Sequence, residues 1–116
     1  MPNLVPVGTR PLDFTLGGHL AHEIRIEKLM SLTLAEFQLT IAPLAGGPLA
    51  PHVSAAEVPL GTGRVVIHYD PRPSVRFGGL LDLPRALVSL TFTGVLDQDR
   101  LAFLKRFELA FQRGGG

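Results

Sequence analysis

Cysteine is absent from this chain of 116 residues, which excludes disulfide bonds, thiolate nucleophiles and thiolate metal sites. Basic and acidic residues number 11 and 10, and a net charge of +1 provides no global attraction to nucleic acid or anionic lipid. The chain also lacks the roughly 18 consecutive apolar residues of a transmembrane helix. Its N-terminus lacks the charge cluster and apolar core of a signal peptide. These absences predict a cytoplasmic protein with no membrane insertion and no nucleic-acid partner.

What is present indicates one folded domain. Hydrophobic residues make up 46% of the chain and charged residues 18%, a balance that excludes disorder for its body. A length of 116 residues suits a single hydrophobic core. We expect one domain over residues 1–113, followed by a flexible glycine tail over 114–116.

The most informative stretch runs from Ser31 to Ile41, where apolar and polar residues alternate but the apolar positions change parity. Leu32 and Leu34 are even-numbered, whereas Phe37 is odd-numbered. A strand that changes face needs a bulge or a tight bend, and small β-barrels use such bends to turn corners. The pattern therefore predicts a bent strand over 31–41 in a barrel.

Alternation predicts the remaining strands, and glycine and proline mark the breaks between them. The expected strands are Phe14–Leu16, Glu23–Lys28, Arg64–Tyr69, Ser74–Leu81 and Leu87–Thr93. Residues 70–73 are expected to turn, and Gly78-Gly79 to form a bulge. Four prolines within residues 42–60 predict that this stretch is largely loop. The fold class is thus predicted to be mainly β.

The period changes near the C-terminus. Phe103, Phe107 and Phe111 recur every four residues and predict an amphipathic helix over about residues 98–112, with Asp97 as its N-cap. The favoured interpretation is that this apolar stripe packs over the open end of the barrel. The alternative is that surplus apolar surface at the three phenylalanines binds a partner protein or a second copy.

Residues that carry chemistry do not form a recognisable catalytic or metal-binding set. His19 and His22 are the only closely spaced histidines, with Glu23 adjacent, and they leave a small enzyme or metal protein as a weaker hypothesis. No serine lies in a nucleophile elbow, and nothing in the sequence pairs two carboxylates. We therefore predict no catalytic residue, no metal site and no enzymatic activity.

The order of the predicted segments resembles the PilZ domain family. The resemblance spans residues 23–112. It is carried by the turn PLGT at 59–62 before a strand, and by LTFTG at 90–94 followed by DQDR ahead of the terminal helix. It implies a small six-stranded antiparallel β-barrel with a C-terminal amphipathic α-helix. It also depends on the strand over 31–41, so a helix there would remove its basis.

Ligand-competent members of that family bind cyclic di-GMP through RxxxR and DxSxxG motifs, and both are incomplete here. Arg10 stands alone, Ser31 and Thr33 occupy the Asp and Ser positions, and Glu36 replaces the Gly. A carboxylate there would repel phosphate. The resemblance implies a non-catalytic protein-interaction or regulatory module in type IV pilus or motility control, with weak or no cyclic di-GMP binding and no cofactor. The alternative is a cyclic di-GMP receptor that uses Arg10, Ser31, Thr33 and Arg76.

Overall fold

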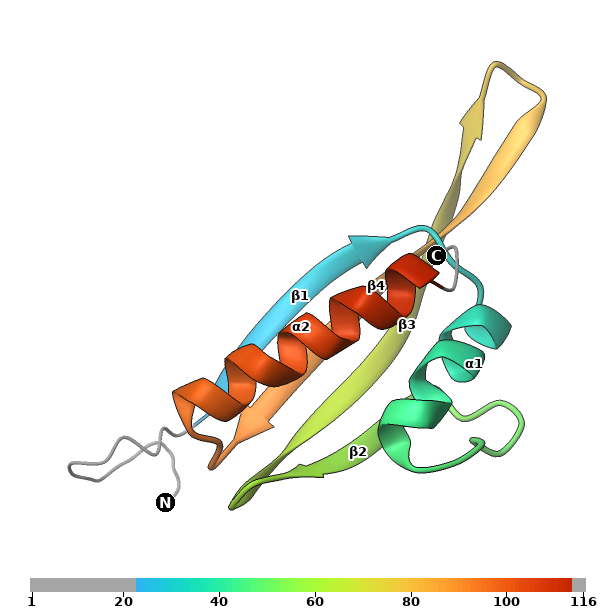
Figure 1. Cartoon of the computed structure of the whole chain (residues 1–116). Coiled ribbons are helices and arrows are strands. Elements are labelled where there is room, and N and C mark those ends of the chain that lie inside the picture. Colours follow the sequence, from blue (N-terminus) through green and yellow to red (C-terminus); the bar gives the residue numbers. More distant parts are fainter. Residues whose placement is uncertain (1–22, 114–116) are drawn as a thin grey trace, which may run out of the picture.

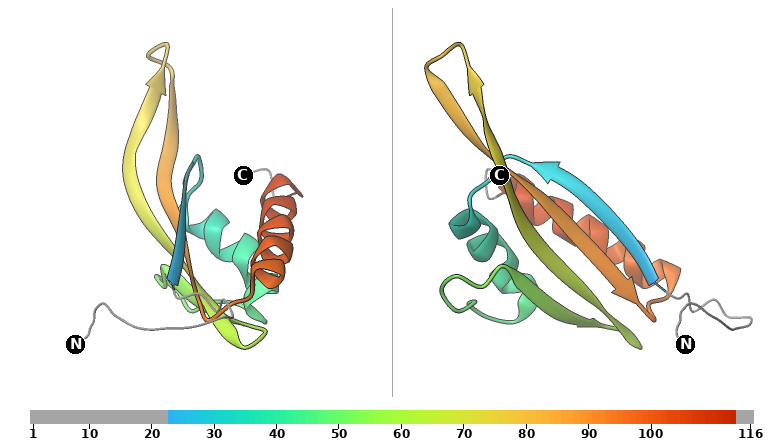
Figure 2. Two further views of the ribbon diagram at one scale, coloured as in Figure 1. Left: turned by 90° about the vertical axis from the view of Figure 1, so that its left-hand side faces the viewer. Right: turned by 180° about the vertical axis from the view of Figure 1, so that it is seen from behind.

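The computed structural model describes residues 23–113, which form one open antiparallel sheet with two helices on one of its faces (Figures 1 and 2). Along the chain, strand β1 is followed by helix α1, strands β2, β3 and β4, and helix α2. The order in the sheet is β1-β4-β3-β2. The bounds are β1 Glu23–Met30, α1 Leu34–Ala45, β2 Ala55–Leu60, β3 Gly63–Phe77, β4 Leu81–Thr93 and α2 Asp97–Arg113.

The core lies between the sheet and the helices. Odd-numbered residues of β3 and even-numbered residues of β4 face it, because the register pairs Val65 with Phe92 and Ile67 with Leu90. Helix α2 presents its phenylalanines to this face, and the Phe103 ring meets Phe92 edge-on at a centroid distance of 6.1 Å. The sixteen buried hydrophobic residues of the described chain form one cluster that joins both layers.

Residues 31–41 do not form the predicted bent strand, because most of them belong to α1. Thr33 is the N-cap, and its hydroxyl oxygen accepts a hydrogen bond from the Glu36 backbone N–H at 3.2 Å. The Glu36 carboxylate accepts in return from the Thr33 N–H at 2.8 Å, which completes a capping box. Phe37 and Ile41 are buried one helical turn apart. The change of parity in the sequence was therefore a helical period and not a bend.

The predicted six-stranded barrel is wrong, since the described residues form a four-stranded open sheet. The loop predicted over 42–60 covers only residues 46–54 in the structure, because α1 extends to Ala45 and β2 begins at Ala55. The expected turn over 70–73 is continuous strand in β3. Gly78 and Gly79 form the β3–β4 turn instead of a bulge, and both have left-handed φ angles, of 60° and 73°. The predicted strand over 14–16 lies outside the described residues.

Other local predictions are confirmed. Strands occur over 23–28, 64–69 and 87–93, and the PLGT segment makes the β2–β3 hairpin. The terminal helix is present, but Asp97 is its first residue and not its N-cap, since the Arg100 N–H bonds to the Leu96 carbonyl at 3.0 Å. Within residues 23–113, neither helix has the length and apolar character needed to cross a membrane.

Candidate functional site: the β3–β4 arm and its base

Strands β3 and β4 are longer than their neighbours and extend beyond them as a two-stranded ribbon. The register of β1 with β4 ends at Met30 opposite Ala86, and that of β2 with β3 ends at Ala55 opposite His68. Residues 72–77 and 81–85 pair only with each other. We call residues 72–85 the arm. It projects from the rest of the sheet in every view (Figures 1 and 2).

The tip of the arm is apolar and exposed. Leu80 is 95% exposed and Leu81 is 54% exposed, next to the Gly78-Gly79 turn. An isolated two-stranded ribbon is at best marginally stable in water. Large apolar side chains at such a tip gain stability when another surface covers them. The arm therefore has the features of a contact element.

One exposed ion pair crosses the middle of the arm. The Arg76 guanidinium donates to both carboxylate oxygens of Asp82, at 3.1 and 3.4 Å, across a directly opposed pair. Below it, the register shifts between Arg72 and Val75. Such a bulge increases the local twist of a ribbon and re-aims its end. The arm thus leaves the sheet at a defined point.

The base of the arm holds a shallow hollow of about 360 Å³, lined by Leu29, Arg72, Pro73, Arg85 and Leu87. Arg72 lies directly opposite Arg85 in the ladder, an arrangement of like charges that destabilises a strand pair. Arg72 is balanced by Asp70, whose carboxylate lies 3.2 Å from its guanidinium. The hollow combines an apolar floor with positive charge.

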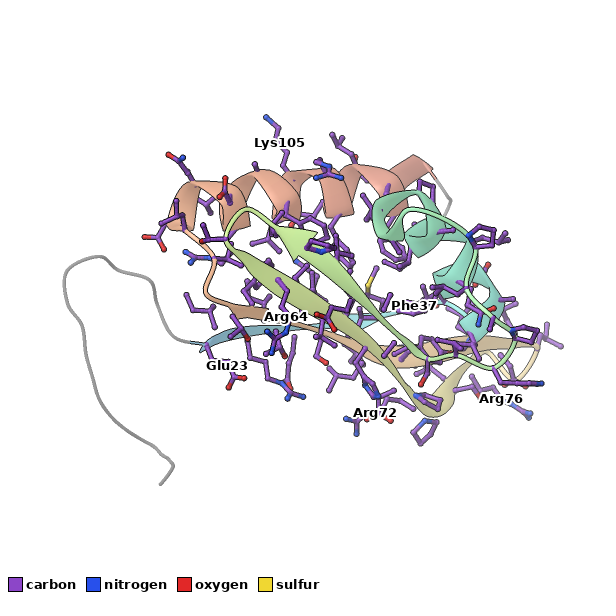
Figure 3. The ribbon with its side chains drawn as sticks, turned by 90° about the horizontal axis from the view of Figure 1, so that it is seen from below. Glu23, Phe37, Arg64, Arg72, Arg76 and Lys105 are labelled. Atoms are coloured by element: carbon purple, nitrogen blue, oxygen red, sulfur yellow. The ribbon has the colours of Figure 1, made fainter. Side chains whose placement is uncertain are left out.

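The hollow belongs to the face of the sheet that the helices do not cover. Figure 3 shows Glu23, Arg64 and Arg72 on this open face, with Lys105 of α2 on the opposite side of the molecule. Its charged side chains form exposed ion pairs, among them Arg25–Glu27 at 3.1 Å and Arg64–Glu57 at 3.5 Å. Exposed pairs of this kind contribute little to stability. The open face therefore displays alternating charges of both signs.

The described residues that were predicted to bind a ligand each bond to a different part of the chain. The Ser31 hydroxyl donates to the Pro84 carbonyl oxygen at 3.0 Å, Thr33 caps α1, and Arg76 pairs with Asp82. Arg10 lies outside the described residues. Ser31 thus links the segment before α1 to β4, Thr33 begins α1, and Arg76 lies on the arm.

The three phenylalanines that the alternative interpretation assigned to partner binding lie in the core. Phe103, Phe107 and Phe111 are 0%, 1% and 5% exposed. Partner contact through these rings would require α2 to leave the sheet. The large apolar residues that this helix exposes are Leu101 and Leu109.

The histidine pair predicted from the sequence cannot be placed. His19 and His22 lie outside the described residues, and Glu23 begins β1. Between residues 23 and 113, no group of three or more His, Asp or Glu side chains is arranged to hold a metal ion.

Tyr69 ends a strand predicted from the sequence, which assigned no role to its side chain, and its ring belongs to the core. Its hydroxyl donates to the Leu32 carbonyl oxygen at 3.2 Å, and its ring lies 5.3 Å from that of Phe37. Burial, and secondarily the Glu36 carboxylate, raises the pKa of Tyr69 above its usual value. The residue fastens the start of α1 to the centre of β3.

No family model matches the chain, and neither the curated proteins nor the solved structures include a significant match.

Proposed function

We propose that this chain is a non-catalytic interaction module and that its arm contacts another protein. The observation that carries the proposal is the pairing of residues 72–85 only with each other, with exposed Leu80 and Leu81 at the tip. Burial of such leucines would supply about 1.5–3 kcal/mol each. That gain would favour contact between the tip and an apolar partner surface.

A protein partner suits the arm better than nucleic acid does. The exposed side chains described at its tip, Leu80 and Leu81, are aliphatic and offer no π-face on which a base could stack. Two of its arginines are already paired, Arg76 with Asp82 and Arg72 with Asp70. The preferred partner surface is apolar, with acidic groups at its rim for Arg85.

We also propose that the chain has no catalytic activity. Support comes from the titratable side chains of the described residues, which lie mainly in exposed pairs. The proposal is limited to the interaction itself, because the barrel from which a pilus or motility role was expected is not the observed fold.

The arm can be tested with a photo-crosslinking amino acid at position 80, introduced into the full chain in its native cells. We expect a protein adduct that Leu81→Asp removes. The matched control is the same crosslinker at Leu101, an exposed leucine of α2 that is 61% exposed. Identical adducts from positions 80 and 101, or none at 80, would refute the proposal. A nucleic-acid adduct at 80 would replace the protein partner with a different class.

A further inference from the structure

The open sheet has two outer edges that differ in their capacity to accept another strand. Strand β2 has six residues and includes Pro59, which has no N–H to donate. Strand β1 has eight residues, without proline or glycine. Within residues 23–113, no strand pairs with the outer edge of β1. A long regular edge of this kind is a template for pairing with another chain.

We infer that β1 pairs antiparallel with β1 of a second copy, about a two-fold axis at Ile26. On the open face of the sheet, this register places Arg25 of each copy opposite Glu27 of the other. Both side chains are exposed, and within one copy they lie 3.1 Å apart. Opposite charges directly across a ladder stabilise it. The strand is therefore complementary to itself.

Neighbouring symmetric registers are less favourable. An axis at Arg25 would oppose two arginines and bring Glu23 against Glu27, and an axis at Glu27 would oppose two glutamates. Like charges directly opposite destabilise a strand pair. An axis at Lys28 would oppose two lysines. The Ile26 axis avoids every like-charge pair and engages all residues from Glu23 to Leu29.

The core side of β1 is compatible with the same register. Ile26 meets its own symmetry mate, and the half-buried Ile24 lies opposite Lys28. An inward-facing lysine on an edge strand usually discourages pairing. Here Glu108 of α2 lies 3.3 Å from the Lys28 ammonium and compensates its charge. Lys28 therefore does not block the second copy.

The pairing has a geometric consequence for the arms. The C-terminal end of β1 lies at the base of the arm, since Met30 is opposite Ala86. Antiparallel β1 strands then place the two arms at opposite ends of one continuous sheet, with the helices of both copies on the same face. A dimer of this form could hold two partners at once, which rests on the proposed function, whereas the pairing itself does not.

The test is a charge exchange in the full chain, followed by analytical ultracentrifugation. We expect the wild-type protein to be a dimer. Arg25→Glu and Glu27→Arg should each weaken dimerisation by about tenfold or more, because both symmetric contacts become repulsive. An equimolar mixture of the two variants should form a heterodimer, and the double variant should regain the wild-type affinity.

Two controls separate this interface from others. Glu57→Arg changes an exposed carboxylate at the opposite edge of the sheet and should leave the dimer intact, as should Leu81→Asp on the arm. A monomeric wild-type protein, as expected if residues 1–22 or another segment cover β1, would overturn the inference. A dimer insensitive to both β1 variants would also overturn it.

Discussion

The replacement of Thr33 by alanine tests the difference between the predicted strand and the observed helix. Thr33 Oγ1 accepts from the Glu36 N–H at 3.2 Å, so its loss leaves an N–H of the first turn without this partner. The replacement also removes the hydroxyl contact to Glu36 Oε1, although this oxygen still accepts from the Thr33 N–H. Thr33→Ser retains a capping hydroxyl and should retain most of the stability.

The expected loss follows from these contacts. Replacement of an N-cap threonine by alanine lowers the free energy of unfolding by about 1 kcal/mol. For a domain of this size, that corresponds to a fall in Tm of about 4 °C. Glu36→Ala should cost somewhat less, because its carboxylate is exposed. The double variant should lose less than the sum of the two, since the contacts are reciprocal.

Thermal unfolding followed by circular dichroism measures the effect, and Thr40→Ala provides the control. Thr40 lies inside α1, where alanine has the higher helix propensity, so we expect an unchanged or slightly higher Tm. Equal Tm values for Thr33→Ala and Thr40→Ala would refute the capping box. They would also reopen the question of a strand over residues 31–41.

Three further predictions concern Tyr69, Gly63 and the cyclic di-GMP hypothesis. Tyr69 is the only tyrosine, and its pKa is raised in the native state. Its contribution to the free energy of unfolding is therefore fully present below pH 10 and is lost as pH rises through the native pKa. Absorbance at about 295 nm should show later ionisation in the native protein than in urea, and a titration that matches free tyrosine would contradict this. Gly63→Ala should lower the free energy of unfolding in urea by about 2 kcal/mol or more, because a Cβ there would overlap the Thr93 carbonyl oxygen; an unchanged midpoint would contradict this close approach. Calorimetry with cyclic di-GMP should show no binding, whereas micromolar binding lost in Arg10→Ala would restore the receptor hypothesis.

Alternation was a reliable guide where one face of a strand is buried. It predicted β1, the inner half of β3 and the end of β4 because charged or polar residues there alternate with core residues. It could not predict the outer half of β3. There Pro71 and Pro73 look like turn residues, but on a ribbon with a free side they cost no ladder hydrogen bond on that side.

Helix α1 was missed although its signals were in the sequence. Thr33 and Glu36 have the spacing of a capping box, and Gly46 follows the last turn with a left-handed φ of 89°. Pro43 argued against a helix in the sequence, because proline is unfavourable in a helix interior. It is tolerated here in the exposed last turn. The role of Tyr69 could not be predicted, since its partner Leu32 is 37 residues away in the chain.

The correction of the fold also relocates the expected partner contact. A closed barrel has neither strand edges nor a projecting ribbon, so surplus apolar surface had to be sought on the terminal helix. In the open sheet the phenylalanines of α2 are buried in the core, because both helices pack on the same face. The surfaces that remain available for contact then belong to the strands. Unequal strand lengths leave residues 72–85 without a third strand beside them, and among residues 23–113 no strand pairs with the outer edge of β1. These two surfaces are independent, so loss of dimerisation by Arg25→Glu and loss of partner contact by Leu81→Asp should occur separately.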